Sequence, residues 1–274
     1  MGLEMRVRAF FRCLFFPPRC CACGSFLQEH LLDTEPRALC EPCRRKWELA
    51  KLATCRRCGE ELSRCRCMSR VLKNAGASVL LKAVSYDKTR DSIARRCVLF
   101  MKRHNSRAAF SYFADELSLL LKDYLAETYT AENSILVTYV PRGKRAVRKE
   151  GFDQSELLAC GVSEALGCDF ARLLGRRHGR LREQKRLGKE DRLANAKDAF
   201  LPESRDWKHL NGQYRCLVLV DDVVTTGATL SACVRLLRRE FHGRIVCLCL
   251  AKRRKPNFLK IPLQFCYKYC IIHI

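Results

Sequence analysis

The feature that most constrains this chain is an apolar strand that runs directly into two carboxylates and a threonine-rich turn. Residues 216–230 read Cys-Leu-Val-Leu-Val-Asp-Asp-Val-Val-Thr-Thr-Gly-Ala-Thr-Leu. A continuous apolar run that ends in a turn is typical of a parallel strand buried on both faces. Asp221 and Asp222 are then expected at its carboxyl end, where open α/β sheets bind their ligands.

The turn after the two carboxylates has the composition of a phosphate site. We expect a helix to begin at Ala228, so that the turn surrounds a helix N-terminus, where unpaired N–H groups and the helix dipole favour an anion. Gly227 lets the backbone approach that anion closely. Carboxylates only accept hydrogen bonds, which suits the hydroxyls of a ribose. The predicted ligand is a ribose 5-phosphate, bound by Asp221, Asp222, Thr225, Thr226, Gly227, Ala228 and Thr229.

An alternative is a magnesium-binding carboxylate pair beside a capped helix. That alternative explains the two aspartates but not the Thr-Thr-Gly-Ala-Thr run. The segment resembles the loop of type I phosphoribosyltransferases that binds 5-phosphoribosyl 1-pyrophosphate (PRPP). The resemblance implies that Asp221 and Asp222 hold the ribose, balance an oxocarbenium-like transition state and act with Mg²⁺. Hypoxanthine-type enzymes carry a further acid where this chain has Thr225, which weakens a purine-salvage interpretation.

Cysteines are concentrated at the start of the chain, with ten of the 19 before residue 70. Paired cysteines at short spacing suit tetrahedral zinc. The first two pairs, Cys20 with Cys23 and Cys40 with Cys43, are predicted to share one structural zinc ion. The next four either complete a second site or interleave with the first, and their spacing leaves both arrangements open: Cys55, Cys58, Cys65 and Cys67.

A disulfide framework is the competing interpretation of these cysteines. No secretory signal is evident in the sequence, and the other nine cysteines are scattered singly through apolar stretches, as in reduced cytosolic proteins. We therefore expect zinc and a cytoplasmic location. We also expect no transmembrane segment, because no run of 18 apolar residues occurs.

Beyond the cysteine-rich part, strand-like and helix-like patterns alternate, which predicts an α/β fold with a parallel sheet flanked by helices. Strands are expected at 79–86, 135–140, 169–174, 216–220 and 245–251, and helices at 91–101, 108–126, 154–166 and 228–240. The predicted division is a zinc-binding module at 14–70, a phosphoribosyltransferase domain at 78–251 and an unassigned basic and apolar tail at 252–274.

Two basic stretches follow predicted strands. The first contains Arg142 and Arg145, which are candidate contacts for a pyrophosphate leaving group because its developing charge requires cations or Mg²⁺. Solvated surface arginines are the alternative. The second stretch, 176–192, predicts a mobile loop that closes over PRPP or follows single-stranded nucleic acid, although it lacks aromatic residues for base stacking.

Two segments resemble the ComF family. Residues 140–154 read Val-Pro-Arg-Gly-Lys-Arg-Ala-Val-Arg-Lys-Glu-Gly-Phe-Asp-Gln, and residues 173–200 contain Gln184, Leu187, Arg192, Asn195, Ala199 and Phe200. The family joins a four-cysteine zinc module to a type I phosphoribosyltransferase domain, and its best-known role is in bacterial DNA uptake during natural transformation. The resemblance runs from about Leu14 to Ala251. The chain departs from the family pattern at Asp153, where Asn is usual, and in the shorter spacing of Cys65 and Cys67.

The net charge of +23 attracts polyanions, which include nucleic acid, phosphorylated ligands and an anionic membrane face. A generally basic surface is the alternative, because the charge is spread along the chain.

Residues 1–18 predict a short packed helix, with membrane-surface contact as the alternative. Two functions remain open. One is a PRPP-binding phosphoribosyltransferase with an unknown acceptor, supporting DNA uptake beside the uptake machinery at the inner membrane face. The other is a non-catalytic zinc protein that binds single-stranded DNA and keeps a PRPP-sensing or relic pocket.

Overall fold

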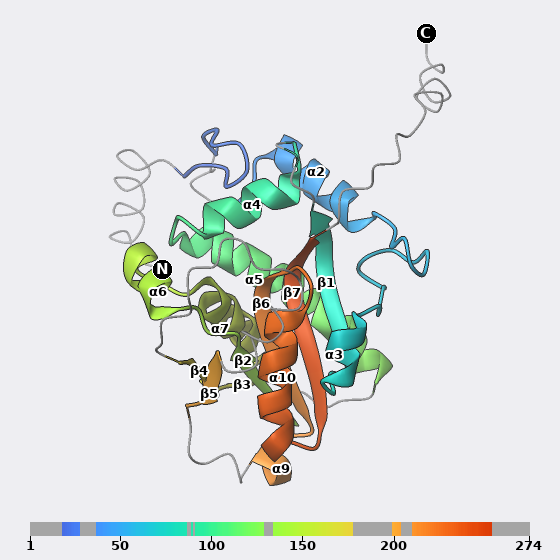
Figure 1. Ribbon diagram of the computed structural model, residues 1–274. Helices are drawn as coiled ribbons and strands as arrows, with labels where there is room; N and C mark the ends of the chain where they lie inside the picture. The colour runs from blue at the N-terminus through green and yellow to red at the C-terminus, as the bar shows by residue number, and fades with distance from the viewer. Residues whose placement is uncertain are drawn as a thin grey trace, which may run out of the picture.

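A five-stranded parallel sheet forms the centre of the computed structural model, which describes residues 18–27, 37–86, 89, 91–128, 134–177, 199–203 and 210–253. The strands lie in the order β1-β7-β6-β2-β3, so β6 is the central one (Figure 1). Their bounds are β1 Val79–Tyr86, β2 Ile135–Tyr139, β3 Asp169–Phe170, β6 Cys216–Val224 and β7 Arg244–Arg253. The predicted α/β class with a parallel sheet is confirmed.

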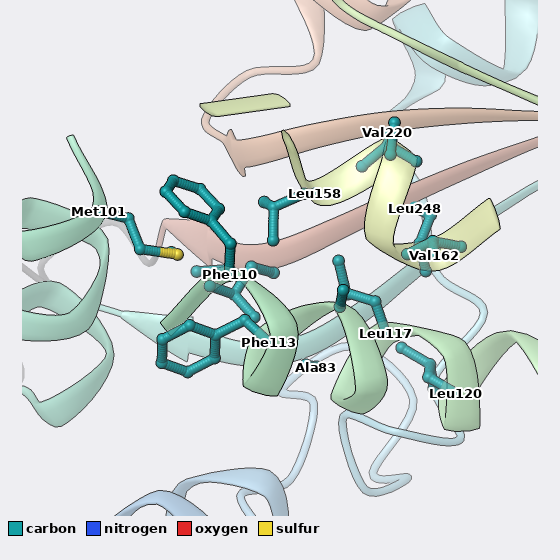
Figure 2. Packing of buried hydrophobic residues seen from close by; sticks show 14 of the residues in the cluster. Ala83, Met101, Phe110, Phe113, Leu117, Leu120, Leu158, Val162, Val220 and Leu248 are labelled. Carbon is teal, nitrogen blue, oxygen red and sulfur yellow. The ribbon is translucent and has the colours of Figure 1, made fainter. Parts of the chain in front are cut away.

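Helices cover both faces of this sheet (Figure 1). One face carries α4 Ile93–Met101, α5 Arg107–Glu127 and α7 Gln154–Leu166, and the other carries α3 Arg70–Asn74 and α10 Ala228–Glu240. Successive strand residues point to opposite faces, so Val218 and Val220 pack with the first group of helices and Leu217 and Leu219 with the second. Figure 2 shows the first of these layers, in which Phe113, Leu117, Leu158 and Val220 contribute buried side chains. Burial on both faces explains why the strands read as continuous apolar runs.

Several elements differ from the sequence prediction. The strand expected at 169–174 is divided: β3 ends at Phe170, and β4 Leu174–Arg176 pairs with β5 Phe200–Pro202 in a separate antiparallel sheet. The central strand β6 is four residues longer than expected because β7 continues beside it, with Val224 opposite Lys252. Four helices among the described residues were not predicted: α2 Glu41–Lys51, α3, α6 Lys144–Glu150 and α9 Leu210–Gln213.

The helix α2 attaches the cysteine-rich part to the sheet. Its Trp47 is fully buried, and its ring lies tilted against the Phe113 ring of α5 with 5.0 Å between the centroids. Trp47 Nε1 also donates to the Glu116 carboxylate at 3.0 Å. Cys20, Cys43 and Trp47 belong to the same apolar cluster as the sheet residues on this face. Apolar packing therefore joins the cysteine-rich segment to the sheet across the domain boundary predicted from cysteine density. That boundary stays a prediction.

Three features of the sequence analysis lie outside the described residues. They are the N-terminal segment up to residue 17, most of the second basic stretch from residue 178, and the tail from residue 254. Within the part of the chain that the structure describes, none of the helices has the length and apolar character needed to span a bilayer.

Candidate functional site

Eight cysteines form two separate groups of four. Cys20, Cys23, Cys40 and Cys43 make the first cluster, and Cys55, Cys58, Cys65 and Cys67 make the second. Within each cluster the sulfur atoms all lie within 4.8 Å of one another, and every cysteine in the described residues is a free thiol. A tetrahedral zinc ion with Zn–S bonds of about 2.3 Å separates its sulfurs by about 3.8 Å.

Both clusters therefore have the composition and spacing to hold zinc. The pairs combine in chain order, which resolves the alternative of interleaved pairs that spacing had left open. Each cluster includes a tight turn, in which the Gly24 N–H donates to the Cys20 carbonyl at 2.9 Å and the Gly59 N–H to the Cys55 carbonyl at 2.8 Å. The shorter spacing of Cys65 and Cys67 still brings both sulfurs into the second cluster.

The two aspartates of β6 occupy different environments. Asp221 is buried, and its Oδ1 accepts hydrogen bonds from the Asp222 N–H at 2.9 Å and from Ser155 Oγ at 3.5 Å. Burial raises the pKa of Asp221 well above its ordinary value, and the neighbouring Asp222 carboxylate raises it further. Asp222 is only partly buried, and its Oδ2 pairs with Lys102 Nζ at 3.1 Å. Asp221 thus serves as an internal acceptor, while Asp222 is the accessible carboxylate.

The N-terminus of α7 connects the ends of β2 and β6. Asp153 caps this helix, with Oδ1 accepting from the Ser155 N–H at 3.0 Å and Oδ2 from the Arg142 N–H at 2.7 Å. Burial raises the pKa of Asp153, and the backbone hydrogen bond from Arg142 opposes that rise. Because a carboxylate has two acceptor oxygens and an asparagine only one, Asp153 suits both contacts. This residue therefore fixes the start of the basic loop relative to the aspartates.

The turn after β6 has the geometry expected of an anion site. Gly227 is the N-cap of α10 with a φ of 83°, in the left-handed region that favours glycine, and a Cβ there would lie 2.9 Å from Ser69 Oγ. Thr226 Oγ1 accepts a hydrogen bond from the Ala228 N–H at 3.3 Å. The side chains of Thr225, Thr226 and Thr229 are exposed. The turn therefore presents accessible hydroxyls at the N-terminus of α10, where helix amides favour an anion.

Two buried polar atoms beside the β2 loop lack a hydrogen-bond partner within the described residues: Arg142 Nη1 and Gln154 Oε1. Gln154 is fully buried, and its Nε2 donates to the Lys102 carbonyl at 3.3 Å. Buried polar atoms are normally satisfied, and leaving one unsatisfied costs about 1–3 kcal/mol. An anionic ligand fits this place because it would supply an acceptor for the guanidinium.

The structure brings most of the predicted ligand residues to one edge of the sheet. Arg142 and Asp221 are linked through Asp153 and Ser155 at the start of α7. Arg145, by contrast, lies on α6 with an exposed side chain.

Sequence reasoning missed Lys102 and Ser155. Lys102 follows Met101, the last residue of α4. A lysine is common at the C-terminus of a helix, because its positive charge interacts favourably with the helix dipole. Its pairing with Asp222 joins residues 120 positions apart, and nothing in the local sequence indicates such a contact.

The five-stranded parallel sheet with helices on both faces, beside two four-cysteine clusters, defines an α/β protein of the type I phosphoribosyltransferase-like fold. No family model matches the chain. Over 116 residues the chain is 34% identical to the DNA utilization protein YhgH of Escherichia coli K12, covering 42% of this chain and 48% of that protein. The protein of the same name from Salmonella typhimurium is 33% identical over 116 residues, with the same coverage.

A third relative is Competence protein F of Haemophilus influenzae, which is 35% identical over 92 residues, covering 33% of this chain and 38% of that protein. The match thus spans about half or less of the length of these relatives. These relatives, named for DNA utilization and for competence, agree with the resemblance to the ComF family found in the sequence.

Proposed function

We propose that this chain binds PRPP with Mg²⁺ at the carboxyl ends of β6 and β2, as a phosphoribosyltransferase-like protein. The observation that carries the proposal is the turn at Gly227, where helix amides and threonine hydroxyls are presented beside an accessible carboxylate. In this proposal the turn holds the 5-phosphate and Asp222 accepts from the ribose hydroxyls. Arg142 Nη1, which is buried and lacks a hydrogen-bond partner within the described residues, would donate to the pyrophosphate group.

Mg²⁺ bound with PRPP would neutralise part of the pyrophosphate charge. The protein itself supplies orientation and fixed positive charge. Lys102 is already paired with Asp222, so ribose binding would require this carboxylate to exchange or share its partner. Asp221 accepts hydrogen bonds from the Asp222 N–H and from Ser155 Oγ, which ties the end of β6 to the start of α7. Among the described residues we identify no base for an acceptor, so the acceptor class stays open.

The biological setting is proposed from the relatives. Their names refer to DNA utilization and to competence, and we propose that this chain likewise supports DNA uptake or use from a cytoplasmic position. A second candidate is a non-catalytic zinc protein that binds single-stranded DNA and senses PRPP. Its support is the high positive charge of the chain. Release of pyrophosphate from PRPP in the presence of an acceptor separates the two candidates.

Calorimetric titration with PRPP and Mg²⁺ tests the site. Asp222→Asn keeps the shape of the side chain but removes a charged acceptor, and such a hydrogen bond is worth about 1.5–3 kcal/mol. We therefore expect PRPP affinity to fall at least tenfold. The Asp221→Asn/Asp222→Asn double variant should bind PRPP no better than Asp222→Asn, because Asp221 is buried.

Asp123→Asn is the matched control, because it makes the same charge change on the exposed face of α5. This control should bind PRPP like the wild type. The proposal is wrong if the wild-type protein shows no binding at millimolar PRPP with Mg²⁺, or if Asp222→Asn binds as tightly as the wild type.

A further inference from the structure

A cavity lies between the second cysteine cluster and the carboxyl ends of β1 and β7. Its volume is about 330 Å³, at the lower end of the range of about 300–1,000 Å³ typical of small-molecule pockets. We call it the cationic pocket. Its lining contains Thr54, Cys55, Arg56, Arg57, Leu62, Lys82, Ser85, Thr225, Lys252 and Arg253.

Five of these ten residues are cations and none is an acid. Within the described residues, no carboxylate forms an ion pair with any of the five. Arg57 is oriented by a hydrogen bond from Nη1 to the Met68 carbonyl at 2.8 Å. With zinc bound, the four thiolates of the second cluster leave a net negative charge beside the pocket that offsets only part of the five positive charges. The remaining like charges repel one another, so an anion in the pocket would relieve this repulsion.

Lys82 adds a buried positive charge to the wall of the pocket. It lies on β1 with 0% exposure, and its Nζ donates to the Cys65 carbonyl at 2.7 Å. An ammonium group has three donors, and among the described residues this is the hydrogen bond that Lys82 makes. A buried charge is costly unless it is paired and hydrogen-bonded. Because its side chain is not accessible, Lys82 acts on a bound anion through its charge behind the cavity wall and not through direct contact.

The lining also indicates what kind of anion fits. The cavity has room for a compound of mononucleotide size, and its hydroxyls and fixed cations match phosphate oxygens. It contains no aromatic ring on which a base could stack. We therefore expect the pocket to bind the phosphate and not the base.

We propose that the cationic pocket binds the phosphate group of a nucleotide, either free or within single-stranded DNA. This site extends beyond the proposed PRPP site, because neither Asp222 nor Arg142 belongs to its lining. Thr225 is shared by the turn after β6 and by the pocket, which makes the two sites neighbours. The inference does not depend on PRPP binding.

The test compares two double variants that remove the same charge. Arg56→Gln/Arg253→Gln alters the pocket, and neither side chain makes a hydrogen bond or ion pair within the described residues, so we expect normal folding and zinc content. Lys122→Gln/Arg239→Gln alters exposed cations on α5 and α10. Binding is measured by calorimetry with deoxythymidine monophosphate and by fluorescence anisotropy with a labelled ten-nucleotide oligo(dT).

We expect the pocket variant to lose at least tenfold in affinity and the control less than threefold. Binding of the monophosphate, with competition against oligo(dT), identifies a free nucleotide as the ligand. Binding of oligo(dT) alone, lost in the pocket variant, identifies the strand backbone. In that case the slope of log affinity against log salt should fall by about 0.7 for each phosphate contact removed.

Equal weakening by the two double variants would attribute binding to the general positive field and overturn the proposal. Absence of binding of both probes to the wild-type protein would also overturn it. Asp222→Asn, which weakens the proposed PRPP site, should leave both nucleotide affinities unchanged. Failure of one site is therefore distinguishable from failure of the other.

Discussion

The two cysteine clusters have the same ligands but attach to the sheet in different ways. The first contributes Cys20 and Cys43, and the adjoining Trp47, to the large apolar cluster that includes the sheet. The second contributes Leu62 and Cys65 as buried apolar residues, and neither belongs to either of the two large clusters. Its contacts with the sheet include the hydrogen bond from Lys82 to the Cys65 carbonyl.

This difference separates a structural role from a ligand-binding role. Apolar burial scales with the area removed from water and stabilises the whole domain, so the first cluster is part of the core. A polar attachment contributes less net free energy. Instead it leaves hydrogen-bonding and charged groups beside the carboxyl ends of β1 and β7, where the cationic pocket lies.

The largest expected effect comes from removing one ligand of the first cluster. Structural zinc contributes about 10–16 kcal/mol in zinc-finger peptides, and Cys43 lies in the shared core. We expect Cys43→Ser to lose one zinc ion and to lower the thermal midpoint of the whole protein strongly. Cys58→Ser should also lose one zinc ion but shift the global midpoint by only a few degrees.

Metal analysis under reducing conditions and thermal unfolding followed by circular dichroism measure both effects. The wild-type protein is expected to contain two zinc ions, one for each cluster. Equal shifts in the thermal midpoint for the two variants would break the distinction between the clusters. A wild-type zinc content below one ion would contradict the assignment of both.

A smaller effect is expected from the side chain that joins the first cluster to α5. Trp47→Ala removes a fully buried ring and its hydrogen bond to Glu116, and such truncations cost about 3–5 kcal/mol. Leu62→Ala, in the second cluster region, should cost less because Leu62 lies outside the large apolar clusters. Urea unfolding measures both free energies. A larger loss for Leu62→Ala would reverse the comparison.

The sequence predicted the sheet and its main helices because their patterns are local. The strand at 79–86 and the helices at 154–166 and 228–240 have the predicted bounds. Glycines in the left-handed conformation flank both helices, with Gly167 at the end of α7 and Gly227 at the start of α10. By contrast, α2 was missed because only Cys43 and Trp47 of its eleven residues are buried.

The candidate site could be predicted only in part, because its residues were visible but their environments were not. In the sequence both aspartates looked like equivalent ribose acceptors. In the structure Asp221 is buried, which raises its pKa, whereas Asp222 is only partly buried. The partner of Asp222 is the C-cap residue of α4, and the partner of Asp221 comes from α7. Such long-range contacts depend on the packing of helices against the sheet, which no local pattern encodes.

The central claim is that the turn after β6 holds PRPP, and a crystal structure with PRPP and Mg²⁺ tests it most directly. We predict the 5-phosphate against the amides at the start of α10, with the ribose hydroxyls at Asp222 and the pyrophosphate near Arg142. Gly227→Val, which places a side chain against Ser69 and in a strained conformation, should abolish this density. PRPP bound only in the cationic pocket, or no PRPP bound at millimolar concentration, would contradict the account.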